Sequence, residues 1–334
     1  MQLRTDTTGP VGLIDVQTDG AHPFGTTDAR LPFPSALGVG TMQRFTLSDS
    51  LVVMLHQYTL TADVRLRRRA EAGDEPVITF SFRNVLRPAA QPADTQPQRL
   101  LPSVQVNSSD IDLDVSFPAG TQINTVIIGM HVALLAQLVG QQAGHPLVQS
   151  LLAGHQSYLY EAIGSPAMEQ VAADLMAHNP ADPLLTFYLT INAQALIYQF
   201  IHQLLKREKK VLYPLRDEEA KLLYTVRSQL VMDLSEPPSM PELARGAGMS
   251  ESKLRRLFRQ VFGLSLYDYY QTVRMREAAR LLREAGLSVS ETGYRLGFSN
   301  LSHFTRLFEK HVGQKPKRYA STPVDGPAPG ESMR

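Results

Sequence analysis

Alternating polar and apolar residues predict β-strands in the first 130 residues of the chain. At 110–117 the two kinds of residue alternate without a break, so the four apolar side chains share one face of a strand. Three further stretches are rich in β-branched and aromatic residues and are bounded by Gly, Pro or Asp: 51–60, 77–82 and 122–130. Several short strands of this kind predict a small barrel or jelly-roll-like domain over residues 1–130.

From residue 131 onward the apolar positions follow the period of a helix. The pattern predicts helices at 132–139, at 165–178 and from Asp182 to about Leu205, which together form a helical layer over 131–205. The last helix has no Asp, Glu, Lys or Arg after residue 184, but its Thr, Asn and Gln residues are too frequent for a span that faces lipid. Its apolar surface exceeds what one small sheet needs, which favours a homodimer interface.

A repeat with a spacing of 49 to 50 residues dominates the C-terminal part of the chain. Ser239 with Glu242 and Ser288 with Glu291 have the spacing of capping boxes, in which the serine oxygen and the carboxylate satisfy backbone N–H groups at a helix start. A glycine follows each serine after nine residues, where a helix can end in a left-handed turn. Each half therefore begins with a short helix and a sharp turn.

A second helix follows each turn. Ser250 and Ser299 are the expected N-caps, and Gly263 and Gly313 the expected ends. Apolar residues at i, i+3 and i+4 give both helices one buried stripe: Leu254, Leu257 and Phe258, then Phe304, Leu307 and Phe308. The product is helix, turn, helix, twice, an arrangement whose second helix suits a major groove of DNA.

The two halves are joined by a predicted helix at 267–285, which would be roughly 28 Å long at 1.5 Å per residue. That length is close to the 34 Å repeat of B-DNA, so a rigid spacer of this kind would place two helices in adjacent major grooves. We therefore predict an α+β protein of two domains, with a β-rich N-terminal domain, its helical layer, and an all-α C-terminal domain with two helix-turn-helix units.

The C-terminal repeat resembles the AraC/XylS family of transcription regulators. The resemblance covers about 100 residues from near 217 to 319 and is carried by several motifs in order. The second unit has Gly297-Phe-Ser, then Phe304, Arg306 and Phe308, then Gly-Gln-Lys-Pro-Lys-Arg-Tyr at 313–319. Two positions depart from the family pattern: Lys315 replaces a small hydroxyl residue, and Ala320 replaces an arginine.

The resemblance implies which side chains face DNA. On the first recognition helix these are Ser252, Lys253, Arg255, Arg256 and Arg259; on the second they are Leu301, Ser302, His303, Thr305 and Arg306. Arginine can donate a fork of hydrogen bonds to guanine, whereas a leucine can meet a thymine methyl group. Arg255 and Arg259 could equally be phosphate contacts or solvated charges, and the expected backbone contacts beyond the second helix are Lys315, Lys317 and Arg318.

Charge and cysteine usage agree with a nucleic-acid partner. The net charge of the 334 residues is only +1, but residues 206–320 hold 22 Lys and Arg against 13 Asp and Glu. Positive charge concentrated on one module is expected for phosphate binding. The absence of cysteine and of a secretory signal at the start predicts a cytoplasmic protein, with no disulfide and no thiolate site.

The N-terminal module resembles the sensing or dimerising domain of such regulators only in plan. Arg65, Arg67 and Arg69 alternate along a predicted strand, so their common face could bind an anionic small-molecule effector or could simply be solvated. A purely structural dimerisation domain without ligand is the alternative. The histidines His131, His145, His155 and His178 have no metal-site spacing, and no cofactor is expected.

No catalytic constellation is recognisable, because the chain lacks a nucleophile elbow, a phosphate-binding glycine loop and a paired His/Glu motif. We therefore predict a sequence-specific DNA-binding regulator, not an enzyme. The resemblance further implies activation and allows contact with RNA polymerase; the homodimer and the absence of a membrane partner are expected from the helix at 184–205. The expected boundaries are 1–130, 131–205, a linker at 206–216, the DNA-binding domain at 217–320 and a disordered tail at 321–334, with a surface loop at 87–102.

Overall fold

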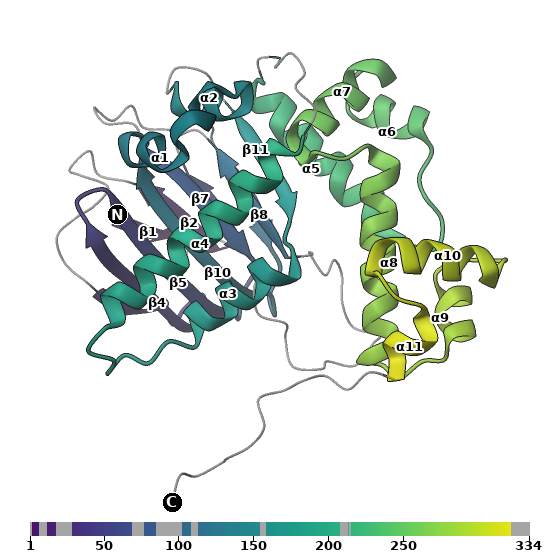
Figure 1. The fold of residues 1–334 in the computed structure, drawn as a ribbon, viewed down its shortest axis with the longest axis horizontal. Helices are drawn as coiled ribbons and strands as arrows, with labels where there is room; N and C mark the ends of the chain where they lie inside the picture. The colour runs from purple at the N-terminus through teal and green to yellow at the C-terminus, as the bar shows by residue number, and fades with distance from the viewer. Residues whose placement is uncertain are drawn as a thin grey trace, which may run out of the picture. The chain divides into compact units, whose positions relative to one another are not determined.

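The fold is taken from a computed structural model of the chain (Figure 1). It describes residues 2–6, 12–17, 29–68, 77–84, 102–107, 113–153, 158–207, 213 and 215–321. Several expected features lie outside these residues: the loop at 87–102 apart from Pro102, the tail beyond Ser321, Arg69 and His155. Six residues of the expected linker, 208–212 and 214, lie outside them too.

Seven strands form the larger sheet, in the order β11-β8-β7-β10-β5-β4-β3. All neighbours in it are antiparallel. The strands are β3 (Ala29–Pro32), β4 (Gly38–Ser48), β5 (Leu51–Leu60), β7 (Val77–Arg83), β8 (Ser103–Asn107), β10 (Gln122–His131) and β11 (Leu159–Ile163). The predicted strands at 51–60, 77–82 and 122–130 are confirmed as β5, β7 and β10.

One face of this sheet is apolar because its strands alternate. In β7, Ile78, Phe80 and Phe82 are buried while the residues between them are half-buried. The register pairs Phe80 with Ile128 of β10 and with Val106 of β8, so apolar residues line up across three strands. This face is the base of the N-terminal core.

Helices cover that apolar face. They are α1 (Val132–Val139), α2 (Pro146–Leu152), α3 (Pro166–Met176) and α4 (Leu185–Leu205), with a short 3-10 turn at Gly140–Gly144. Figure 1 shows α4 lying across the strands, and its Phe200 meets Phe80 edge to face at 5.8 Å between ring centres. The predicted helices at 132–139, 165–178 and 182–205 are confirmed within three residues at each end. Their layer also contains β11, a strand that the sequence pattern did not indicate.

Four more strands form a second sheet in the order β1-β2-β6-β9. They are β1 (Gln2–Asp6), β2 (Gly12–Gln17), β6 (Val64–Arg68) and β9 (Leu113–Phe117), and β2 pairs with β6 in parallel. A small apolar cluster includes Val64 and Phe117 from this sheet together with Phe33, Leu37, Met42 and Leu60. The described strands thus form two open sheets, and the expected closed barrel or jelly roll is not observed among them.

The C-terminal part of the described chain is helical. Its helices are α5 (Asp217–Met232), α6 (Met240–Gly246), α7 (Glu251–Phe262), α8 (Leu266–Arg283), α9 (Val289–Arg295), α10 (Leu301–Val312) and α11 (Pro316–Ser321). The predicted connecting helix at 267–285 is α8, which begins one residue earlier and ends two residues earlier.

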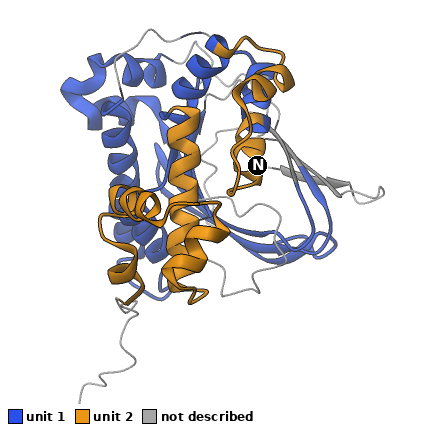
Figure 2. Ribbon diagram, turned by 90° about the vertical axis from the view of Figure 1, so that its right-hand side faces the viewer, with its two compact units in different colours: residues 1–89, 99–225, 252–264 blue, residues 90–98, 226–251, 265–334 orange. Residues whose placement is uncertain are grey.

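The chain forms two compact units (Figure 2). Unit 1 comprises residues 1–89, 99–225 and 252–264, and unit 2 comprises 90–98, 226–251 and 265–334. Unit 1 thus contains both sheets, helices α1 to α4 and also α7, whereas α8 to α11 belong to unit 2. The domain boundaries expected at residues 130, 205 and 216 stay predictions, but the grouping of α7 with the sheets was not foreseen.

Candidate nucleic-acid interface

Both capping boxes form as the sequence predicts. The backbone N–H of Glu242 donates to Ser239 Oγ at 3.4 Å, and the backbone N–H of Ser239 donates to Glu242 Oε2 at 3.2 Å. Ser288 and Glu291 repeat the arrangement at 3.2 and 2.8 Å. These hydrogen bonds from the serines hold the pKa of both carboxyls below the usual value. The starts of α6 and α9 are therefore fixed by local interactions.

The two turns also match. Gly248 and Gly297 have φ of +59° and +74°, the left-handed region that glycine adopts without strain. Behind each of them a backbone N–H reaches back five residues: Met249 to Ala244 O at 3.0 Å, and Phe298 to Gly293 O at 2.9 Å. The same hydrogen bond therefore recurs 49 residues later, and the repeat extends from sequence to backbone geometry.

The second helix of each pair shows one difference from the sequence prediction. Gly263 and Gly313 end α7 and α10 with φ of +74° and +86°, as expected. The N-cap of α10, however, is Asn300, whose Oδ1 accepts from the N–H groups of Ser302 at 2.9 Å and His303 at 3.1 Å. The expected N-cap Ser299 is therefore wrong, because an asparagine one residue later satisfies two free donors at once.

The turn of the second pair is fixed from α8 by a buried arginine that the sequence pattern did not single out. Arg274 is 7% exposed, and its Nε donates to the carbonyl oxygen of Leu296 at 2.9 Å, while its Nη2 donates to the same oxygen. Its guanidinium lies 3.8 Å from the centre of the Phe298 ring. Burial lowers the pKa of Arg274, but an arginine remains charged at neutral pH.

The apolar stripes are buried as predicted except for Leu307, which is half-buried, and the polar positions of α7 and α10 lie toward the surface. Leu254 and Phe258 in α7 and Phe304 and Phe308 in α10 are fully buried. Of the residues expected to read DNA on α7, four are exposed and Lys253 is half-buried: Ser252, Arg255, Arg256 and Arg259. On α10, Ser302, His303 and Arg306 are exposed, while Leu301 and Thr305 are half-buried.

Lys253 and Arg256 each have a partner that the sequence did not reveal. Lys253 Nζ lies 2.6 Å from Glu219 Oε1 of α5. The guanidinium of Arg256 lies 4.0 Å from the centre of the Tyr213 ring. On α10, Leu301 packs near Gly293, where a Cβ on the glycine would lie 2.6 Å from a leucine methyl group. The candidate side chains of α7 thus contact a carboxylate and a tyrosine ring, whereas Leu301 of α10 packs against its own helix pair.

The remaining candidate residues are scattered. Lys315, Lys317 and Arg318 are exposed in and just before α11. Of the expected effector face, Arg65 is exposed on β6. The side chain of Arg67 and the whole of Arg69 are not among the described parts of the chain. The structure therefore does not assemble the three arginines into a described site.

A buried polar row on the larger sheet was missed by the sequence analysis. Gln105 and Asn107 of β8 and Glu161 of β11 are at most 2% exposed, and Gln105 Nε2 donates to Asn107 Oδ1 at 3.2 Å. Across the same face, burial lowers the pKa of His56 in β5 to about 4, so its imidazole is neutral at pH 7. Polar residues at alternate positions of 103–107 were the available signal.

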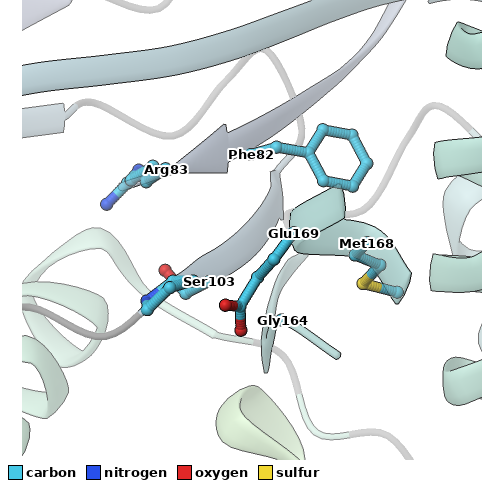
Figure 3. A pocket seen from close by; sticks show the side chains of 7 residues that line it. Phe82, Arg83, Ser103, Gly164, Met168 and Glu169 are labelled. Carbon is cyan, nitrogen blue, oxygen red and sulfur yellow. The ribbon is translucent and has the colours of Figure 1, made fainter. Parts of the chain in front are cut away.

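One small pocket lies at the edge of this sheet (Figure 3). It is lined by Phe82, Arg83, Pro102, Ser103, Gly164, Met168 and Glu169, and its volume is about 10 Å³. Ligand pockets for small molecules usually measure about 300 Å³ or more, so this hollow does not hold an effector.

Metal and membrane sites are not indicated in the described part of the chain. There, no three His, Asp or Glu residues lie close enough together to hold a metal ion. Among the described helices, none combines the length and the apolar character that a membrane span requires.

Comparison with known proteins identifies the helical repeat. A family model described as a helix-turn-helix domain matches residues 243–322. The HTH-type transcriptional regulator GlxA of Rhizobium meliloti is 36% identical over 94 residues, which are 28% of this chain and 29% of that protein. The regulatory protein PchR of Pseudomonas aeruginosa is 45% identical over 64 residues, 19% and 22% of the two chains. The chain thus spans less than a third of either relative.

A shorter relative is matched over most of its length. The multiple antibiotic resistance protein MarA of Escherichia coli is 26% identical over 111 residues, which are 33% of this chain and 87% of that protein. Among solved structures, the DNA-binding domain of AdpA, in complex with a target DNA, is 27% identical with a TM-score of 0.27 and covers 32% of this chain and 92% of its own.

The segment that matches the family model begins in α6 and ends just after α11, so it contains both turn glycines and both closing glycines of the repeat. Of the relatives given above, GlxA is named as a transcriptional regulator and PchR as a regulatory protein. The chain therefore carries a helix-turn-helix domain at residues 243–322, and over 94 residues it is similar to an HTH-type transcriptional regulator.

Proposed function

We propose that the chain is a sequence-specific transcription regulator that reads two neighbouring major-groove segments with α7 and α10. The observation that carries the proposal is the repeated pair of helices, each with a buried apolar stripe and an exposed polar face. The two pairs are joined by α8, whose 18 residues give a length of about 27 Å. A spacer of that length suits two binding segments about one turn of B-DNA apart.

Selection of bound fragments from random duplex DNA tests the proposal. We expect a preferred site with two conserved blocks whose centres lie about 10 base pairs apart. Binding to the selected duplex should exceed binding to a scrambled duplex by about 10³-fold or more at physiological salt. If no preferred sequence emerges, the chain is not a sequence-specific regulator.

Arg256→Ala is expected to weaken binding to the selected duplex by about 10- to 100-fold and to relax the preference at one or two base pairs, because the variant loses a forked contact to guanine. Lys317→Ala is the matched control. It should weaken binding to all duplexes alike and reduce the slope of log K against log salt by about one, as expected for a phosphate contact. Titrations at several salt concentrations separate the two effects, and an unchanged preference in Arg256→Ala would contradict its assigned role.

For the N-terminal module we propose control by a small-molecule effector. The buried polar row of Gln105, Asn107 and Glu161 supports this, because polar side chains inside a sheet domain can orient a ligand. The alternative is a purely structural dimerisation domain. An upward shift of the thermal transition with one class of small molecule, and a change of DNA affinity with the same molecule, would favour the effector. From the family resemblance alone we further propose activation and contact with RNA polymerase.

We also propose a homodimer through α4. Four large apolar side chains are exposed along one side of this helix and its N-cap: Leu184 (63%), Phe187 (63%), Ile191 (48%) and Tyr198 (66%). Apolar stripes of this kind mark interaction surfaces more often than solvated faces.

Phe187→Asp is expected to shift the protein toward monomer, with a dissociation constant at least about tenfold higher, because a charge is costly to bury without a partner. Thr186→Asp, which adds the same charge at an exposed neighbouring position, should leave the association unchanged. Sedimentation at micromolar concentration measures both variants. A wild-type monomer would refute the dimer, and equal effects of the two variants would place its interface elsewhere.

A further inference from the structure

We propose that α7, the first DNA-reading helix, is held against the rest of unit 1 by Arg207, Tyr213 and Glu219. We further propose that these contacts compete with DNA. The inference rests on the proposed function of α7. Its starting point is that α7 belongs to the same compact unit as the sheets, while α8 to α11 belong to the other unit (Figure 2). Within unit 1, three separate interactions connect α7 to residues outside the helix-turn-helix repeat.

The first interaction holds the C-terminal end of α7. Arg207, just after α4, donates from Nη1 to the carbonyl oxygens of Gln260 and Val261, at 3.2 Å each. Its Nη2 donates to the carbonyl oxygen of Glu161 in β11 at 2.5 Å. One guanidinium therefore joins the last turn of α7 to an edge strand of the sheet.

Charge and shape both favour this position of Arg207. The last carbonyls of a helix carry partial negative charge, so a cation there stabilises the helix end. Burial lowers the pKa of Arg207 to about 10, which leaves the group charged at neutral pH. A Cβ on Gly263 would lie 2.6 Å from Arg207 Nε, so the closing glycine of α7 also makes room for the guanidinium.

The second interaction occupies the expected base-reading arginine. Tyr213 is connected to α7 by two hydrogen bonds: its N–H donates to Gln260 Oε1 at 3.0 Å, and its carbonyl oxygen accepts from Gln260 Nε2 at 2.8 Å. These bonds fix the tyrosine beside α7, and its ring lies 4.0 Å from the guanidinium of Arg256. An arginine held against this ring by a cation–π interaction must leave it to extend into a groove.

The third interaction occupies Lys253. Its ammonium lies 2.6 Å from Glu219 Oε1, and the other carboxylate oxygen accepts from the Arg216 N–H at 3.1 Å. Although burial alone would raise it, the pKa of Glu219 is held below its usual value by hydrogen bonds with Lys253 and Arg216. A phosphate that approached Lys253 would have to replace a carboxylate that is already fixed in place. Two of the five α7 residues expected to face DNA, Lys253 and Arg256, are therefore engaged within the chain.

Because of these contacts, we expect the rest of unit 1 to control α7 and not α10. Arg306 of α10 is exposed, and its helix belongs to unit 2. The state of the sheet unit therefore acts on DNA binding through Arg207 and β11 at one end of α7 and through Tyr213 and Glu219 along its length. A change that releases these contacts should strengthen binding at the α7 half of the DNA site.

The test uses the full chain with Tyr213→Ala and Glu219→Gln combined, and Tyr213→Phe as the matched control, which keeps the ring under Arg256. The double variant is expected to bind the selected duplex about three- to tenfold more tightly, the range that corresponds to loss of one cation–π contact and one partly exposed ion pair. Tyr213→Phe should bind like the wild type. Adding Arg256→Ala to the double variant should remove most of the gain.

Hydrogen exchange of the α7 amides without DNA provides a second readout. Protection in α7 should fall about fivefold in the double variant and also in Arg207→Ala, while α10 keeps its protection. Unchanged exchange in α7 would overturn the docking. Faster exchange with unchanged or weaker DNA binding would overturn the competition with DNA. Failure of the wild type to prefer any duplex would instead refute the proposed function, and the exchange result would still decide whether α7 is docked.

Discussion

Gly297→Ala is expected to lower the free energy of unfolding of unit 2 by about 3 to 5 kcal/mol, because left-handed backbone strain and steric overlap add. The backbone of Gly297 has φ +74°, which an alanine adopts only with strain. Its Cβ would also overlap the carbonyl oxygen of Ser235 and lie 2.9 Å from the Ser235 Cα. Because the overlapping atoms of Ser235 belong to the backbone, they cannot move aside as the end of a flexible side chain can.

The equivalent glycine of the first pair is the control for this prediction. Gly248 has φ +59°, but nothing lies within 4 Å of the position where its Cβ would stand. Gly248→Ala should therefore cost only the backbone strain, about 1 to 2 kcal/mol. Denaturant unfolding of both variants, followed by helical circular dichroism, measures the difference. Equal losses would mean that the contact with Ser235 does not constrain the turn.

Arg274→Ala is expected to cost about 2 to 4 kcal/mol, because it removes a charged donor and a cation–π contact together. The variant leaves the Leu296 carbonyl oxygen without its two arginine hydrogen bonds, which come from Nε and Nη2. It also exposes one face of Phe298, whose ring lies 3.8 Å from the guanidinium. The turn that orients α10 should loosen, and binding at the α10 half of the DNA site should weaken with it.

Arg274→Lys distinguishes this explanation from a simple effect of charge. Lysine keeps the positive charge but has no planar fork, so it cannot donate twice to one oxygen while lying flat on a ring. We expect it to recover less than half of the lost stability. Thermal unfolding of the three proteins at equal pH gives the comparison. Full recovery by lysine would show that the charge alone matters.

Local patterns in the sequence were sufficient for most helices and for the central strands. The strand at 51–60 and the helix at 132–139 were predicted with their observed bounds, because alternation and helical period depend only on which face is buried. The capping boxes and the closing glycines were equally predictable, since their partners lie within a few residues in the chain.

Other elements could not be predicted because their partners are distant in sequence. Strand β11 reads as part of a helical region, but it pairs with β8 from Leu159 opposite Asn107 to Ile163 opposite Ser103. The expected barrel is replaced by two open sheets among the described strands, since strand order is set by long-range pairing and not by alternation. The N-cap of α10 was missed for a local reason, because Asn300, next to Ser299, accepts from two backbone N–H groups at the helix start.

In the candidate site, too, some features follow from local sequence and others only from distant contacts. The sequence by itself determined two helix pairs, their turn glycines and the side chains on their polar faces, because each of these depends on residues within one or two helical turns. Only the tertiary structure decided that Gly297 is pressed against Ser235 while Gly248 is open, and that Arg256 and Lys253 are engaged by Tyr213 and Glu219. Those contacts join residues 34 to 62 positions apart, and no local pattern encodes which distant side chain will fill a given space.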